Sequence, residues 1–98
     1  MYRFYSYKVA HGIITHRLPY NSVIQKSVIV KDNSMLIHAY IDIEEERIEC
    51  RKFYCFNTED VIFDKNFSNL IFVDSVLYNE QIYHIYYESR LDEKLKRK

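Results

Sequence analysis

The feature that most constrains the fold is an alternation with a period of two residues in the middle of the chain. Over residues 35–43, every second side chain is apolar, at Met35, Ile37, Ala39, Ile41 and Ile43. Successive side chains of a β-strand point to opposite faces of the sheet, so this spacing places all five on one face. We therefore expect a half-buried strand here, with Ile37, Ala39 and Ile41 in the core.

Shorter patterns of the same kind predict six or seven strands in all. They cover residues 2–9, 13–18, 23–30, 35–43, 48–56, 70–78 and 82–89. Asp32-Asn33-Ser34 and Asn79-Glu80-Gln81 are turn-forming clusters that would close two hairpins. Neighbouring strands joined by short turns indicate an all-β fold, either a small antiparallel β-sandwich or a partly open barrel.

One segment, residues 58–69, departs from the strand pattern. Thr58 could cap a short helix with Glu59 and Asp60 in its first turn, where negative charge is favourable. The apolar residues that follow do not form a helical stripe, so we expect a single helical turn or an irregular loop. The chain is thus expected to hold at most one short helix.

Length and charge limit the organisation of the chain and the class of partner. A chain of 98 residues suits a single antiparallel β domain over 1–90, with a basic, frayed tail over 91–98. Fourteen Lys and Arg balance fourteen Asp and Glu, which argues against binding to long nucleic acid. The sequence shows no apolar run long enough for a membrane-spanning helix and no signal peptide, so we expect a cytoplasmic protein with no membrane partner.

The sequence shows no recognisable catalytic or metal-binding motif. Cys50 and Cys55 are separated by an odd number of positions, so on one strand they point to opposite faces and would not share a metal. His11 and His16 flank a turn without a Cys or acidic residue at metal-ligand spacing. We therefore expect a protein that is not an enzyme, with no catalytic residue, no metal and no cofactor.

Tyrosine, histidine and arginine on the expected strands form the candidate ligand site. His38 shares a strand face with Tyr40, and His84 shares one with Tyr86, so rings for stacking and polar groups occur together. Arginine binds phosphate in a bidentate manner. The candidate ligand-binding residues are Arg3, Tyr5, Arg17, His38, Tyr40, Arg51, His84 and Tyr86.

Two other interpretations of these residues stay open. The tyrosines could simply cover a small core, and the arginines could lie on ordinary solvated strand faces with charge pairs between strands. The tyrosines could also form a subunit interface, where this residue type is enriched. Ten Tyr and six Phe exceed what a core of this size can hide, so we expect a homo-oligomer, in the first place a dimer.

Six short blocks also occur in a characteristic order. They are Tyr2-Arg3-Phe4, Ile14 to Pro19, Leu36 to Asp42, Arg51 to Tyr54, Leu70 to Val76 and Tyr83 to Glu88. In this set and order the chain resembles a widespread family of small phage and prophage β-rich proteins of unknown function, over residues 2–88. It departs from the family at Asn57-Thr58-Glu59, where many members have a glycine-containing turn.

The resemblance implies a function by context. Small phage proteins without catalytic motifs often bind host molecules, and one class sequesters the cyclic nucleotide signals of antiphage systems such as CBASS. The chain is accordingly expected to be an anti-CBASS sponge, a phage protein that sequesters a cyclic dinucleotide in the host cell cytoplasm. The expected partner is a small anionic nucleotide. The alternatives are a protein–protein inhibitor of a host enzyme and a virion or assembly accessory protein.

Overall fold

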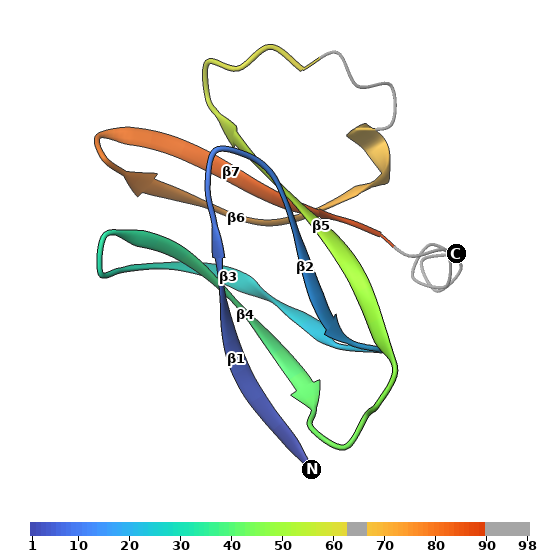
Figure 1. Ribbon diagram of the computed structural model, residues 1–98. Coiled ribbons are helices and arrows are strands. Elements are labelled where there is room, and N and C mark those ends of the chain that lie inside the picture. The colour runs from blue at the N-terminus through green and yellow to red at the C-terminus, as the bar shows by residue number, and fades with distance from the viewer. Residues whose placement is uncertain (63–66, 90–98) are drawn as a thin grey trace.

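The computed structural model describes residues 1–62 and 67–89, which form seven β-strands and one 3-10 turn (Figure 1). The strands are β1 (Tyr2–Val9), β2 (Gly12–Pro19), β3 (Val23–Lys31), β4 (Ser34–Asp42), β5 (Ile48–Asn57), β6 (Leu70–Tyr78) and β7 (Gln81–Glu88), and the turn is Phe67–Asn69. Within these residues, none of the helical structure is long and apolar enough to cross a membrane.

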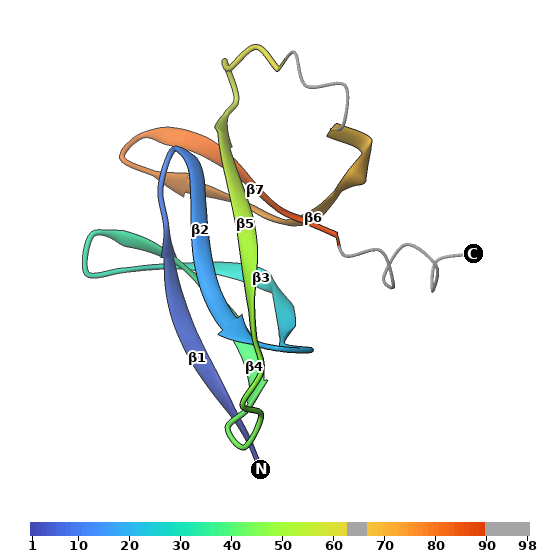
Figure 2. The ribbon, with the colours of Figure 1, turned by 45° about the vertical axis from the view of Figure 1, so that its right-hand side comes forward.

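The strands form two antiparallel sheets that face each other (Figures 1 and 2). The three-stranded sheet has the order β1-β4-β3, and the four-stranded sheet has the order β2-β5-β7-β6. β1 is an edge of the three-stranded sheet, and β2, the next strand in the chain, is an edge of the four-stranded sheet. These two edges therefore meet at the turn between β1 and β2. The prediction of an antiparallel sandwich or partly open barrel is confirmed.

A second pair of sheet edges meets where β3 lies beside β6. The register shifts between Ile24 and Val28 on β3 and between Phe72 and Asp74 on β6, so each strand carries a bulge. The carboxylate of Asp74 accepts a hydrogen bond of 3.0 Å from the backbone N–H of Val28. The two bulges therefore join the sheets through a side chain in place of a strand ladder.

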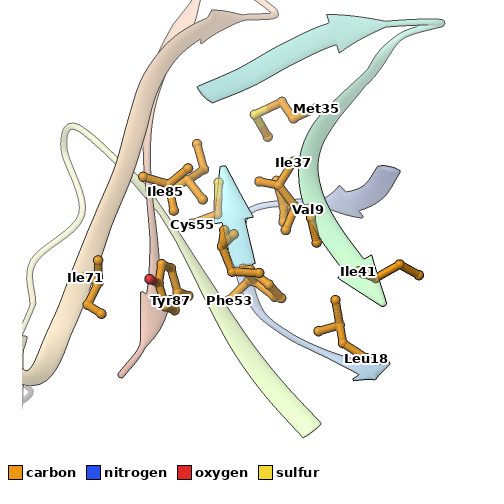
Figure 3. Close-up of a cluster of buried hydrophobic side chains, with 13 residues drawn as sticks. Val9, Leu18, Met35, Ile37, Ile41, Phe53, Cys55, Ile71, Ile85 and Tyr87 are labelled. Carbon is orange, nitrogen blue, oxygen red and sulfur yellow. The ribbon is translucent and has the colours of Figure 1, made fainter. Parts of the chain in front are cut away.

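The core fills the space between the two sheets (Figure 3). Ile37, Ala39 and Ile41 on β4 are buried, as predicted, and they pack in one cluster with Phe53 and Ile85 from the opposite sheet. The alternation ends sooner than the sequence indicates. Ile43 lies beyond the end of β4 and is 41% exposed.

Both predicted hairpins are present, and their turns have the expected chemistry. Asp32 and Asn33 have φ angles of 51° and 58°, and Asn79 and Glu80 have φ angles of 50° and 64°. Two consecutive left-handed residues match the twist of the flanking strands, which is why two-residue hairpins favour this geometry.

In the segment 58–69, the described residues hold one 3-10 turn, at Phe67–Asn69, and no α-helix. This agrees with the expected single turn or irregular loop. The expected frayed tail over 91–98 lies outside the described residues.

Candidate functional site

The structure does not bring the eight predicted ligand-binding residues together. His38 and Tyr40 lie on the outer face of the three-stranded sheet. His84 and Tyr86 lie on the outer face of the four-stranded sheet, which points the opposite way. The other four are placed individually: Arg3 and Tyr5 are exposed on β1, Arg17 is exposed on β2, and Arg51 is buried on β5.

Arg51 is an interior group. Its side chain is only 3% exposed, and Nε donates a hydrogen bond of 3.1 Å to Glu49 Oε1. Nη2 donates to the carbonyl oxygen of Ser22 at 3.2 Å, and the guanidinium carbon lies 5.3 Å from the centre of the Tyr87 ring. The sequence analysis names Arg51 as a candidate ligand-binding residue, and the structure places its side chain inside the fold, where it contacts Glu49, Ser22 and Tyr87.

His84 is held by hydroxyl groups on both sides. Its Nδ1 lies 2.6 Å from Ser75 Oγ on β6, and its Nε2 lies 2.8 Å from Thr58 Oγ1. Thr58 Oγ1 also donates to the carbonyl oxygen of Ile82, and the Thr58 backbone N–H donates to the same oxygen. His84 therefore fastens the end of β5 to the β6–β7 hairpin.

An aromatic cluster covers the outer face of the four-stranded sheet. It consists of Tyr54, Phe56, Phe67, Phe72 and Tyr86, which we call the outer aromatic face. Tyr86 is at its centre, with ring centroids 5.0 Å from Phe67, 5.3 Å from Phe72 and 5.9 Å from Phe56. Phe72 is 48% exposed, so the cluster is open to solvent.

A second aromatic cluster lies on the outer face of the three-stranded sheet. The Tyr40 ring centroid is 5.1 Å from that of Tyr2 and 5.0 Å from that of Phe4. Tyr2 is 57% exposed and Phe4 is 61% exposed. Large aromatic rings that stack on each other in water mark this cluster as a surface that a partner could cover.

A cavity opens at the end of the barrel where three turns gather, and we call it the mouth cavity. Figure 1 shows the β1–β2 turn, the β3–β4 hairpin and the β6–β7 hairpin on this side of the molecule. Its volume is about 340 Å³. The residues that line it are Lys8, Val9, Ala10, His11, Ile14, Ser34, Met35, Tyr78 and Tyr83.

Contacts between the turns hold the aromatic residues of the mouth cavity in place. The Tyr78 hydroxyl donates a hydrogen bond of 2.6 Å to the carbonyl oxygen of Asn33, across from one hairpin to the other. The Tyr83 ring centroid lies 6.2 Å from that of Tyr78 and 5.8 Å from that of His11. Tyr78 is thus held by a hydrogen bond, and Tyr83 packs between Tyr78 and His11.

His11 at the rim is paired with a carboxylate. Its Nε2 lies 2.7 Å from Asp60 Oδ2, and the same oxygen accepts the backbone N–H of Asn57 at 2.8 Å. The hydrogen bond from His11, and then that from Asn57, lowers the pKa of Asp60 below its usual value. Lys8, an exposed residue of β1, is the one lysine among the lining residues.

None of the eight predicted residues lines the mouth cavity. Lys8, Tyr78 and Tyr83 come from separate strands, and only the packing of the two sheets brings them together. The sequence holds one signal for this cavity. Tyr78 and Tyr83 lie on either side of the predicted turn between β6 and β7, so both must lie at the same end of the fold.

Across the described part of the chain, His, Cys, Asp and Glu side chains form no group of three or more that could hold a metal ion.

Comparisons of the sequence and structure with protein-family models, curated proteins and solved structures find no match.

Proposed function

We propose that this chain is a non-enzymatic binding protein that takes a small anion with a flat ring into the mouth cavity. The observation that carries the proposal is the cavity itself, because it combines fixed aromatic rings, an apolar floor and a cation. Its volume of about 340 Å³ lies within the range of roughly 300–1,000 Å³ for small-molecule sites, and mouths of β-barrels are common places for such sites.

The lining indicates the chemistry of the ligand. Tyr78 and Tyr83 offer rings against which a flat group can stack, and Val9 and Met35 provide an apolar surface. Lys8 offers an ammonium group for an anion, whereas the positive charge that His11 can carry is directed to Asp60. A nucleotide combines a flat ring with a phosphate.

The resemblance to phage proteins gives this proposal its specific form. In that form the ligand is a cyclic dinucleotide, and the chain sequesters it in the host cytoplasm as an antiphage signal. In this proposal the ligand binds at the mouth cavity, which none of the eight residues named from the sequence lines.

A thermal-shift screen against cyclic mono- and dinucleotides, followed by calorimetry, tests the proposal. A ligand at about 100 times its dissociation constant adds roughly 2.7 kcal/mol to stability, which is on the order of 10 °C or more in the midpoint for a domain of this size. Absence of a shift with every nucleotide would reject the nucleotide form of the proposal.

Two pairs of variants locate the site. Lys8→Gln is expected to weaken binding by about tenfold or more, as loss of a charged hydrogen bond does. Tyr83→Leu keeps apolar bulk and removes the stacking ring, so it should also weaken binding. The controls are Lys52→Gln and Tyr40→Leu, whose side chains lie outside the lining of the cavity. Equal losses in variants and controls would place the ligand elsewhere.

The outer aromatic face supports a second candidate function, inhibition of a host enzyme by direct contact. Aromatic residues are enriched at the centres of protein interfaces, and the exposed Phe72 ring beside the half-buried Tyr86 ring fits that role. Phe72→Glu would then abolish inhibition of the enzyme without weakening nucleotide binding. If the variant inhibits as well as the parent protein, this face is not the contact surface.

A further inference from the structure

The first half of β1 is exposed on both of its faces and along one of its two edges. Every residue from Tyr2 to Ser6 is exposed, so side chains on both faces of the strand meet solvent. β1 is also an edge strand, because β4 is its only partner among the described strands. β1 and β2 meet at their turn and separate toward the N-terminus (Figure 1). An exposed edge strand that is rich in aromatic residues is a template for a further strand.

Two hydrogen bonds show which backbone groups face the open edge. The Met1 carbonyl oxygen accepts the N–H of Ile43 at 3.0 Å, so Met1 points its backbone toward the strand that pairs with β1. Along an antiparallel strand, this direction alternates from one residue to the next. Tyr2, Phe4, Ser6 and Lys8 therefore point their N–H and C=O groups away from β4. The Lys8 carbonyl oxygen agrees with this, because it lies 2.7 Å from His16 Nε2 on β2.

We propose that the open edge of β1 pairs antiparallel with β1 of a second copy of this chain, about a two-fold axis at Phe4. Phe4 then faces the partner's Phe4, and Tyr2 faces the partner's Ser6. The two three-stranded sheets become one continuous sheet of six strands, with the two copies of β1 at its centre.

The register follows from hydrogen bonding and charge. With the axis at Phe4, three pairs of outward-pointing residues face each other, and each pair exchanges two N–H···O bonds. With the axis at Arg3, only two pairs remain, and Arg3 lies directly opposite the partner's Arg3, which is destabilising. With the axis at Tyr5, four such pairs face each other. Only two of them can exchange both hydrogen bonds, because in the two Tyr2–Lys8 pairs the Lys8 carbonyl oxygen already has a partner in His16.

Side chains on both faces of β1 suit a second copy as the partner. With the axis at Phe4, Arg3 lies opposite the partner's Tyr5, and Arg3 already holds its guanidinium carbon 5.9 Å from the centre of its own Tyr5 ring. On the other face, the contacting rings of Tyr2, Phe4 and Tyr40 would meet the same three rings of the partner. The strand is thus complementary to itself in hydrogen bonding, in arginine–ring contacts and in aromatic surface.

Oligomeric state is the first test. Sedimentation equilibrium should show a dimer of the full chain at tens of micromolar. Phe4→Pro removes the N–H group at the axis but leaves the β1–β4 hydrogen bonds intact, so the dimer dissociation constant should rise about tenfold or more. Tyr54→Ala, on the outer aromatic face, is the matched control and should leave the dimer unchanged. A monomeric parent protein, or a Phe4→Pro variant that dimerises as well as the parent, would overturn the proposal.

Disulfide cross-linking tests the register without relying on Phe4→Pro to fold. In a Cys50→Ser background, Arg3→Cys and Tyr5→Cys chains are prepared separately and oxidised alone and as a mixture. Residues 3 and 5 of the two copies would face each other with Cα atoms about 4.5 Å apart, within the range that a disulfide spans. Cross-linked dimer should therefore form chiefly in the mixture. Equal cross-linking in the Arg3→Cys chain alone would show the axis at Arg3, and none in any sample would reject the pairing.

Discussion

Arg51 places a full positive charge inside a small β-fold. Glu49 lies beside it with a side chain that is 13% exposed, and the Ser22 carbonyl oxygen accepts a second guanidinium hydrogen bond. Taking a guanidinium and a carboxylate out of water costs several kcal/mol per ion, which their attraction offsets only while both are present. Removing one partner takes away the attraction that offsets the desolvation of the other.

Arg51→Ala is therefore expected to lower the free energy of unfolding by about 3–5 kcal/mol, measured by urea denaturation. Arg17→Ala removes an exposed arginine and should change it by less than about 0.5 kcal/mol. The double variant Arg51→Met/Glu49→Leu removes both charges and keeps their volume, so it should recover much of the loss. A mild effect of Arg51→Ala would mean that the guanidinium is not needed to balance Glu49.

The two cysteines should differ sharply in reactivity. Burial, and secondarily the charge of Asp60, raises the pKa of Cys55 to about 11, so its thiol stays protonated and shielded at neutral pH. Cys50 is exposed. A thiol-reactive dye should label one cysteine in the native protein and two after denaturation, and Cys50→Ser should abolish the native signal. Native labelling of Cys55 would contradict its burial.

At the scale of elements, β4 holds the three-stranded sheet together because it pairs on both edges. Ile41 is buried in the core, and Ile41→Ala should lower the free energy of unfolding by about 2–5 kcal/mol, through lost apolar burial and the cavity that remains. Ile43→Ala makes the same chemical change at an exposed position just beyond the strand and should cost less than about 0.5 kcal/mol. Equal costs would contradict the end of β4 at Asp42.

The β6–β7 turn holds a residue in a costly conformation. Glu80 has a φ angle of 64°, and left-handed backbone costs an L-residue roughly 1–2 kcal/mol, whereas glycine adopts it freely. Glu80→Gly should therefore stabilise the protein by up to about 1 kcal/mol, after allowing for the greater entropy of glycine in the unfolded chain. Glu46→Gly, in a loop without positive φ, is the control and should not stabilise. A destabilised Glu80→Gly variant would show that another contact of Glu80 outweighs the strain.

The strands and hairpins were predictable because their signals are local. Alternation marks each strand, and Asn-rich clusters mark the turns at Asp32-Asn33 and Asn79-Glu80. The two bulges were not predictable, since they depend on β3 and β6 lying side by side and on the Asp74 bond to Val28. The candidate site could not be predicted for the same reason. Alternation along a strand shows which residues share a face, but it does not show which face is buried at Arg51. It also does not show that three turns far apart in the sequence line one cavity.

At the scale of the whole molecule, side chains join the two sheets where strand ladders do not. Asp74 bonds to Val28 at one seam, and at the mouth of the barrel Tyr78 bonds to Asn33. Asp60, in the segment after β5, contacts His11 in the β1–β2 turn. The shape of the mouth cavity therefore depends on polar contacts between segments that are far apart in the chain.

The His11–Asp60 contact makes part of the stability depend on pH. The folded pKa of Asp60 is lowered by its hydrogen bonds to His11 and then to Asn57, so the folded state favours the ionised carboxylate. Its contribution is present above the ordinary Asp pKa of about 3.9 and is lost as the pH falls through the lower folded pKa. Asp60→Asn should therefore destabilise the protein at pH 6, and the gap to the parent protein should close as the pH falls below about 4.

Urea denaturation of the two proteins at several pH values between about 2.5 and 6 measures this gap. The Glu59→Gln variant, altered at the exposed neighbouring carboxylate, controls for the loss of one negative charge on the same loop. Folding lowers the proton affinity of Asp60 in the parent protein and in Glu59→Gln, but Asp60→Asn has no carboxyl group at this position. The parent and Glu59→Gln should therefore both show a steeper loss of stability in acid than Asp60→Asn. A gap that stays constant across this range would mean that His11 does not hold the Asp60 carboxylate in its ionised form.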